Sequence, residues 1–286
     1  MQSNNPVFRR AEGFNGKPTQ NAYGNVSYPA SGMTYPGYGA GGRYTGAASS
    51  PPQAPARVSR PMTIDSVVQK TGITLAVLVI AAGATWLLTG DPTASRRAAS
   101  LLYTLVLVGA FGGLALSMVN SFKRHVSPAL VLAYAALEGV FIGAMSKEFQ
   151  LVFGPGVITG AVLGTVAAFA GTLAAYKFFD IKVSAKFRRY VVAAMFGFVA
   201  VTLLDFVLSF FGASFGFNGL GGVGLVASVI GLAIGVLMLI LDFDYVERGI
   251  AAGLPEDESW RAAFGLSVTI VWIYVELLRI LSIFRN

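Results

Sequence analysis

The chain of 286 residues contains no cysteine and one histidine. It has 12% charged residues, against the roughly 25% of an ordinary soluble domain. Without cysteine there can be no disulfide, thiolate nucleophile, Cys-ligated zinc or iron–sulfur cluster, and one histidine cannot build a polyhistidine metal site. Because 55% of the residues are hydrophobic, polar side chains are too few to cover a soluble surface. The composition predicts a membrane protein and excludes most of the chemistries of soluble enzymes. We expect neither enzyme activity nor a cofactor.

Residues 1–62 differ in composition from the rest of the chain. They hold eight of the twelve prolines and nine glycines. Such a segment buries too little apolar surface to offset the entropy of ordering it. We therefore expect a disordered cytoplasmic tail over 1–62 and a transmembrane domain over 63–286.

Seven apolar runs follow the tail. Each is close to the roughly 20 residues that an α-helix needs to cross a hydrocarbon core. None alternates polar with apolar residues as the strands of a membrane barrel do. The fold class predicted is an all-α membrane protein with seven transmembrane helices. The runs are Thr71–Thr89, Ala99–Val119, Pro128–Met145, Gly156–Phe178, Tyr190–Phe211, Gly222–Tyr245 and Ala263–Phe284.

Small residues recur three or four positions apart in two of the runs. This spacing is typical of helices whose backbones approach closely in lipid. We interpret these residues as packing faces rather than as a ligand site. They are Gly109, Gly112, Gly113 and Ala115 in the second run and Gly156, Gly160 and Gly164 in the fourth.

Basic residues are distributed unevenly between the two ends of the spans. One side has the bases of the N-terminal segment and of the loops near Lys123 and Lys177–Arg189, whereas the other has only Arg96, Arg97, Lys147 and Arg285. Such a bias favours a cytoplasmic N-terminus and an outside C-terminus in the cell membrane. Topology and attraction to anionic lipid explain the net charge of +7, so we expect a lipid bilayer and no nucleic acid as partner.

Six ionisable residues lie inside or at the ends of the spans. An ionisable group inside a spanning helix is costly and therefore indicates a function. The six are Glu138, Asp205, Asp242, Asp244, Glu276 and Arg279.

The last two spans carry the densest group of acids. A short connection returns the chain antiparallel, so Asp242 and Glu276 can face each other if the two helices are neighbours. Two carboxyl groups in contact at low dielectric cannot both ionise, and they would share a proton as a latch. The alternative is that each bonds separately to a hydroxyl such as that of Thr269 or Tyr274. Asp244 lies near the headgroups, with Arg248 nearby.

Two further acids have two interpretations each. Glu138 lies in the middle of the third span beside Gly139 and Gly143, and Asp205 lies in the outer half of the fifth. Either side chain would line an aqueous path for cations or would belong to a polar network with serine and threonine partners.

Two segments near the end of the chain resemble the Bax inhibitor-1 family. They are Ile240-Leu-Asp242-Phe-Asp244-Tyr-Val and Tyr274-Val-Glu276-Leu-Leu, and Glu138-Gly139 is similar to a Glu-Gly step of that family. The bacterial branch of the family includes a calcium-leak protein and a regulator of a membrane-bound protease. The likeness covers about Thr63 to Asn286.

The resemblance implies a seven-helix fold with a central last helix and a pH-sensitive calcium leak gated by paired carboxylates. Asp242 and Glu276 take the positions of the family's sixth-helix and seventh-helix acids. This chain departs from the pattern in having Glu at 276, an acidic insert at Leu254–Ser259, and Arg279 one turn beyond Glu276. An i,i+3 pair of Glu276 with Arg279 favours the ionised carboxylate and opposes proton sharing.

The function expected is a proton-modulated Ca²⁺ leak channel. Ca²⁺ binds oxygen ligands, and the spans offer carboxylates, hydroxyls and carbonyls. Glu138, Asp205, Asp244 and Arg279 are expected to line or modulate the path, and a resident metal site is not predicted. The alternative is a non-transporting regulator that binds a membrane protease or another integral membrane protein. An intramembrane aspartyl protease is disfavoured because Asp242 follows Leu241 and Glu276 follows Val275, without the glycine typical of such enzymes.

Overall fold

A computed structural model describes residues 60–285, and within them every regular element is a helix. All seven predicted spans are helical, and all are long and apolar enough to cross a membrane. Residues 1–59, to which the expectation of a disordered tail applies, lie outside the described part. The helices are α1 (Ile64–Leu88), α2 (Arg96–Phe122), α3 (Pro128–Phe153), α4 (Val157–Phe178), α5 (Ala185–Ser209), α6 (Gly222–Ala251) and α7 (Glu258–Ile283).

Several helices extend beyond the apolar runs that predicted them. Helix α1 begins before its run because Thr63 caps it: the Thr63 hydroxyl accepts from the Ser66 amide and the Ser66 hydroxyl accepts from the Thr63 amide, both at 3.1 Å. This reciprocal capping satisfies two backbone donors that the first turn leaves free. Helices α3 and α6 continue past their runs to Phe153 and Ala251. Hydropathy locates the apolar centre of a helix, whereas caps decide where it ends.

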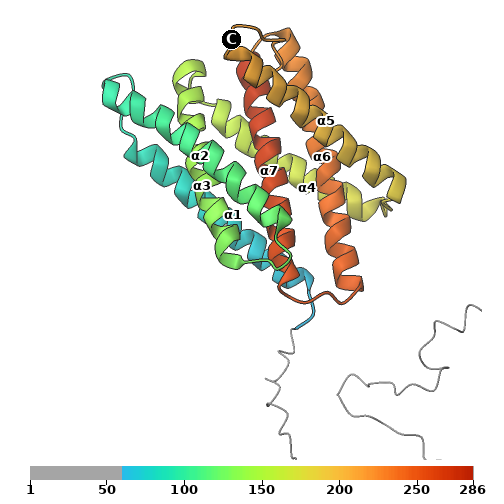
Figure 1. Cartoon of the computed structure of the whole chain (residues 1–286). Helices are drawn as coiled ribbons and strands as arrows, with labels where there is room; N and C mark the ends of the chain where they lie inside the picture. Colours follow the sequence, from blue (N-terminus) through green and yellow to red (C-terminus); the bar gives the residue numbers. More distant parts are fainter. Residues whose placement is uncertain (1–59, 286) are drawn as a thin grey trace, which may run out of the picture. The chain divides into compact units, whose positions relative to one another are not determined.

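Helix α7 is central in the domain, as the resemblance implies. It packs against α1, α3, α4 and α6, and in Figure 1 it runs between the group of α1, α2 and α3 and the pair of α5 and α6. Half of its most apolar stretch is buried, against 11% for α5. Side chains of α7 therefore face protein on most sides, whereas those of α5 mostly face outward.

The predicted packing faces are confirmed for the glycines inside α2 and α4, whereas Ala115 is exposed and Gly156 precedes α4, where it faces the Arg285 side chain. A Cβ at Gly109 would lie 2.6 Å from the backbone nitrogen of Phe141, and one at Gly164 would lie 3.1 Å from the Leu277 side chain. The glycines of α2 thus pack on α3, and those of α4 pack on α7. Gly139 and Gly143 do the same from α3, against the backbone of α1.

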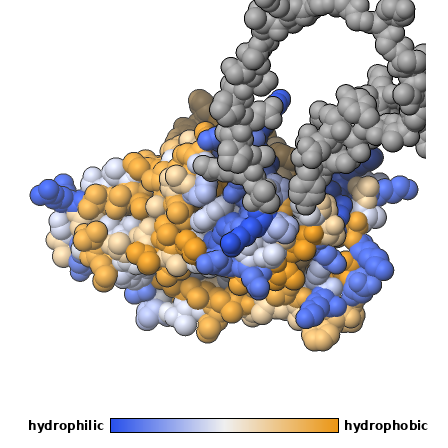
Figure 2. All heavy atoms as spheres, turned by 90° about the horizontal axis from the view of Figure 1, so that it is seen from below, coloured by the Kyte–Doolittle hydropathy of each residue, from blue (hydrophilic) through white to orange (hydrophobic). Residues whose placement is uncertain are grey.

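The segment before α1 is tied to the α6–α7 loop. The Met62 amide donates to the Leu254 carbonyl at 2.7 Å, and the Glu256 amide donates to the Arg60 carbonyl at 2.7 Å. The Met62 side chain is 1% exposed. Arg60 to Met62 therefore belong to the folded domain, although the composition assigned them to the tail. Figure 2 views this end, where hydrophilic residues gather among hydrophobic ones.

Candidate functional site

A cavity of about 670 Å³ lies among α3, α5 and α7. Within residues 60–285, the backbone of α5 comes close to that of α6 alone, whereas α5 reaches α7 through side chains, and the space lies between these helices. Its lining combines acids, a base, an amide and aromatic rings. Lining residues include Glu138, Glu276, Arg279, Asn218, Tyr134, Phe198 and Trp272. Two of the acids predicted from the sequence thus line one space, together with the predicted base.

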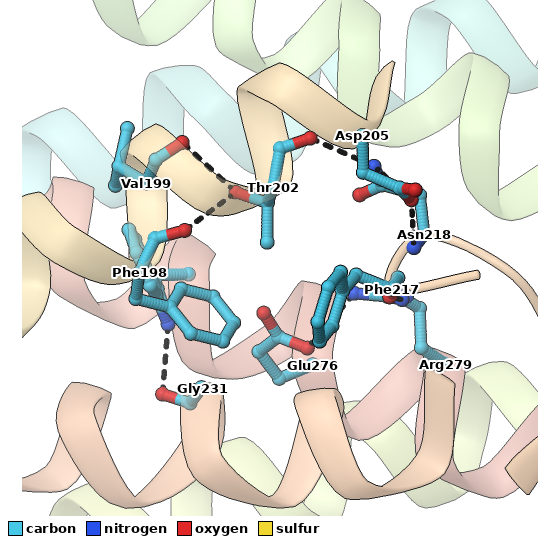
Figure 3. Close-up of polar contacts among 10 residues, drawn as sticks. Phe198, Val199, Thr202, Asp205, Phe217, Asn218, Gly231, Glu276 and Arg279 are labelled. Carbon is cyan, nitrogen blue, oxygen red and sulfur yellow. Dashed lines mark hydrogen bonds and ion pairs between the residues drawn. The ribbon is translucent and has the colours of Figure 1, made fainter. Parts of the chain in front are cut away.

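Glu276 is 6% exposed and lies against α6. A Cβ at Gly231 would stand 2.6 Å from its Oε1 and 2.8 Å from the ring of Phe198. Gly231 therefore leaves the space that the carboxylate and the Phe198 ring occupy. The other oxygen, Oε2, accepts from Arg279 Nη1 at 3.3 Å. The i,i+3 pair predicted from the sequence is present (Figure 3).

Arg279 also joins α7 to the α5–α6 loop. Its Nη2 donates to the carbonyl of Phe217 at 2.5 Å. The guanidinium thus holds the Glu276 carboxylate on one side and loop backbone on the other (Figure 3). Arginine suits this position because its donors point in two directions from one rigid plane.

Asp205 organises the same loop from the end of α5. The residue is 2% exposed, and its carboxylate accepts from the amides of Phe215 at 2.5 Å, Gly216 at 3.2 Å and Asn218 at 2.9 Å. The side-chain amide of Asn218 adds a bond at 3.0 Å. Of its two interpretations, the polar network is the one found, but its partners are backbone amides and an asparagine instead of serine and threonine.

Glu138 is the second acid of the cavity. One of its oxygens lies toward Gly113 of α2, where a Cβ would stand 2.6 Å from Oε2. In the described part of the chain, its carboxylate has neither a hydrogen bond nor a basic partner. Gly113 thus makes room for Glu138 as Gly231 does for Glu276. In each case the glycine lies on the helix that packs against the helix of the acid.

The predicted contact between Asp242 and Glu276 is wrong. Asp242 Oδ2 accepts from the Thr269 hydroxyl at 2.6 Å, whereas Glu276 lies against Gly231. Asp242 is three helical turns beyond Gly231 on α6, about 16 Å by the rise of an α-helix. The helices are neighbours as expected, but their register separates the two acids. Separate hydroxyl bonding, the alternative from the sequence, describes Asp242.

Asp244 lies outside the cavity and near the end of α6. It is 7% exposed and accepts from Arg188 of α5 at 2.9 Å. Arg248, one turn further on α6, forms a second ion pair with it. The neighbouring Arg248 was expected, whereas Arg188 was not. Arg188 thus joins α5 to α6 at the end opposite the Asp205 loop, whereas Arg248 pairs with Asp244 within α6.

Residues 60–285 contain no group of three or more His, Asp or Glu side chains arranged to hold a metal ion. Glu138 and Glu276 come from different helices, and Arg279 occupies one oxygen of Glu276. The described residues therefore offer isolated carboxylates along a cavity.

The sequence did not indicate the aromatic wall or the loop. Phe198 and Trp272 pack with ring centroids 5.6 Å apart, and the Trp272 indole donates to the Gly231 carbonyl at 2.9 Å. In an apolar run, aromatic residues that line a cavity look the same as those that face lipid. The asparagine and glycines between α5 and α6 marked a turn, but nothing in them indicated Asp205 as the acceptor.

Seven apolar helices with many large hydrophobic side chains facing outward, such as Leu87 at 80% and Phe122 at 81% exposed, define a polytopic helical membrane protein. A family model described as Bax inhibitor 1 like matches residues 5–286, and the chain belongs to this family. The match begins well before Thr63, where the resemblance was expected to start.

The chain is also similar to an uncharacterized protein of Chlamydia muridarum (strain MoPn / Nigg). It is 34% identical over 82 residues, which are 29% of this chain and 34% of that protein. The chain thus spans about a third of the length of this curated relative.

Proposed function

We propose that the protein is a proton-modulated calcium leak channel of the Bax inhibitor-1 type in the cell membrane, with its N-terminus in the cytoplasm. Family membership supports the class. The observation that carries the proposal is the cavity in which Glu138 and Glu276, two carboxylates from spanning helices, line one space. Acids inside a bundle are typical of ion and proton pathways.

The carboxylates of Glu138 and Glu276 would attract Ca²⁺ into the cavity. Asn218 and Thr202 line the same space and add an amide and a hydroxyl oxygen. These are hard oxygen ligands of the kind Ca²⁺ uses, and an ion that keeps part of its water shell needs only a few of them. Weak, separate contacts suit an ion that must leave again.

Protons would act on the Glu276–Arg279 pair. A protonated Glu276 no longer attracts the guanidinium, which then keeps its bond to the Phe217 carbonyl alone. The loop and α7 would separate more easily in that state. A difference of a few kcal/mol between two states is enough to shift a channel from closed to open.

Calcium flux into proteoliposomes across a pH series tests this proposal. Glu138→Gln should lower the flux, and Glu276→Gln should flatten its pH dependence, because each removes one ionisable group without changing its size. Glu148→Gln is the matched control, since Glu148 is exposed on α3 and does not line the cavity. Unchanged flux and pH response in both cavity variants would exclude this path.

A further inference from the structure

The cavity has a composition that differs from that of an inorganic cation site. Besides its two acids it is lined by rings from three helices, among them Tyr134 of α3, Phe198 of α5 and Trp272 of α7. Its volume of about 670 Å³ falls within the range of about 300–1,000 Å³ seen for sites that bind small organic molecules. The space is larger than one metal ion needs.

The two acids of the cavity are not electrostatically equivalent. Glu276 is paired with Arg279 at 3.3 Å, and Arg279 is further held by the Phe217 carbonyl. Glu138 has no basic partner in the described part of the chain. A carboxylate inside a spanning helix requires either a proton or a cation beside it. The Glu138 end of the cavity is therefore where a positive charge is most stabilised.

The surroundings of Glu138 favour an organic cation over a tightly bound metal ion. Ca²⁺ takes six to eight oxygen ligands when held by protein, and within residues 60–285 Glu138 belongs to no group of three or more Asp, Glu or His side chains that could hold a metal ion. Aromatic side chains lie one turn to either side of it, Tyr134 and Phe141, and both line the cavity. Aromatic faces attract weakly hydrated organic cations such as quaternary ammonium groups.

The far wall of the cavity is fixed before any ligand arrives. Phe198 and Trp272 pack against each other at 5.6 Å between centroids, and the indole is held by its bond to Gly231. Figure 3 shows the Phe198 ring and the Glu276 carboxylate facing one space. A wall that is already ordered loses little entropy when a ligand packs on it.

We propose that this cavity is a binding site for an organic cation, a protonated amine or quaternary ammonium ion with an apolar body. Its charged head would lie at Glu138, and its body would pack on the wall of Phe198 and Trp272. This site lies in the cavity proposed for calcium, and a bound organic cation would compete with the ion at Glu138: a ligand that fits the cavity would stay bound, whereas a permeating ion must leave it.

Titration of the purified full chain with benzyltriethylammonium tests the proposal. Binding is measured by calorimetry and by tryptophan fluorescence, with Trp272→Phe to assign the optical signal. We expect saturable binding that Glu138→Gln weakens about tenfold or more, while Glu148→Gln leaves it unchanged. Arg279→Gln should tighten binding several-fold, because it removes the cation that neutralises Glu276. Benzenesulfonate, an anion with the same ring, should not bind.

Three results would overturn the site: no saturable binding to the unmodified chain, equal binding of the sulfonate, or an affinity that neither Glu138→Gln nor Arg279→Gln changes. If Glu138→Gln does not fold, the opposite response expected of Arg279→Gln still decides the outcome. Because binding is measured without ion flux, failure here leaves the calcium proposal standing, and loss of flux leaves this site standing.

Discussion

At the scale of single residues, two glycines, Gly113 and Gly231, provide space for the carboxylates of Glu138 and Glu276. Gly231→Ala would bring a Cβ to 2.6 Å from Glu276 Oε1 and 2.8 Å from the Phe198 ring. We expect this substitution to lower the stability by about 1–3 kcal/mol, the usual cost of overpacking. Thermal unfolding in detergent, monitored by circular dichroism, measures the change.

Gly197→Ala is the matched control for Gly231→Ala. Gly197 also lies in a helix, but a Cβ there would have nothing within 4 Å. It should leave stability unchanged or raise it by up to about 1 kcal/mol, because alanine is the better helix former. If both substitutions shift the unfolding temperature equally, Gly231 does not provide the space for Glu276.

The separation of Asp242 from Glu276 gives a second prediction at this scale. Groups more than about 7–10 Å apart without shared partners act additively, and the helical rise places these two further apart than that. We expect the effects of Asp242→Asn and Glu276→Gln on calcium flux to add in the double variant. A double variant no different from either single one would indicate that the two acids share a proton after all.

The wrong prediction of a contact between Asp242 and Glu276 shows which structural features hydrophobic periodicity can and cannot predict. Periodicity identifies neighbouring helices and which residues are out of place in them. The register of α6 against α7 is set by contacts such as the Trp272 indole on Gly231, between residues 41 positions apart in the chain. By contrast, the pair of Glu276 and Arg279 was predictable because it is local, one turn of a single helix.

At the scale of elements, the α5–α6 loop depends on one carboxylate. Asp205 accepts from three loop amides and the Asn218 side chain, and an amide at 205 would direct its own N–H donors at some of these donors. Asp205→Asn should therefore lower stability by about 1–3 kcal/mol, since it leaves partly buried donors unsatisfied. Hydrogen exchange at Phe215, Gly216 and Asn218 should become faster while the amides of α7 stay protected.

Asp180→Asn provides the comparison for the Asp205 loop. Asp180 also lies in a connection between helices, but its ion pair with Lys182 is exposed. Surface pairs of this kind contribute little to stability, so the unfolding temperature should not change. Equal exchange rates at the loop amides in the Asp205→Asn and unmodified proteins would contradict the role given to Asp205.

The elements themselves were largely predictable, because each span must satisfy its own backbone hydrogen bonds in lipid and so appears as one apolar helix. The ends of the helices were less predictable than the helices themselves. The start of α1 depends on the hydrogen bonds of Thr63 with Ser66. Composition did not indicate that Arg60 to Met62 belong to the folded domain, because their hydrogen-bond partners lie nearly two hundred residues away, in the α6–α7 loop.

At the scale of the whole molecule, the folded domain has a sharp beginning. A chain that starts at residue 60 keeps the bonds to Leu254 and Glu256 and the buried Met62. It should show near-normal calcium flux and stability. A chain that starts at Ile64 loses the Met62 contacts and the Thr63 cap and should be less stable by about 2–5 kcal/mol.

If removal of residues 1–59 abolishes binding to a membrane protease or other integral partner while flux is absent in both forms, the regulator is the better description.

The absence of cysteine makes the orientation of the whole molecule directly measurable. Exposed loop residues can be changed one at a time to the only thiol in the chain: His125 and Lys182 at the end where α1 and α7 begin, and Ala94 and Ala213 at the other. With the N-terminus in the cytoplasm, a membrane-impermeant maleimide applied to intact cells should label Ala94→Cys and Ala213→Cys and leave His125→Cys and Lys182→Cys unlabelled until lysis.

The result also bears on proton control, because Glu276 and Arg279 lie near the end of α7 that meets the Asp205 loop. Labelling of Ala94→Cys and Ala213→Cys in intact cells would place the α5–α6 loop outside, so that external protons reach Glu276 by the shorter route. The reverse pattern would make cytoplasmic pH the nearer signal and would contradict the topology inferred from the basic residues.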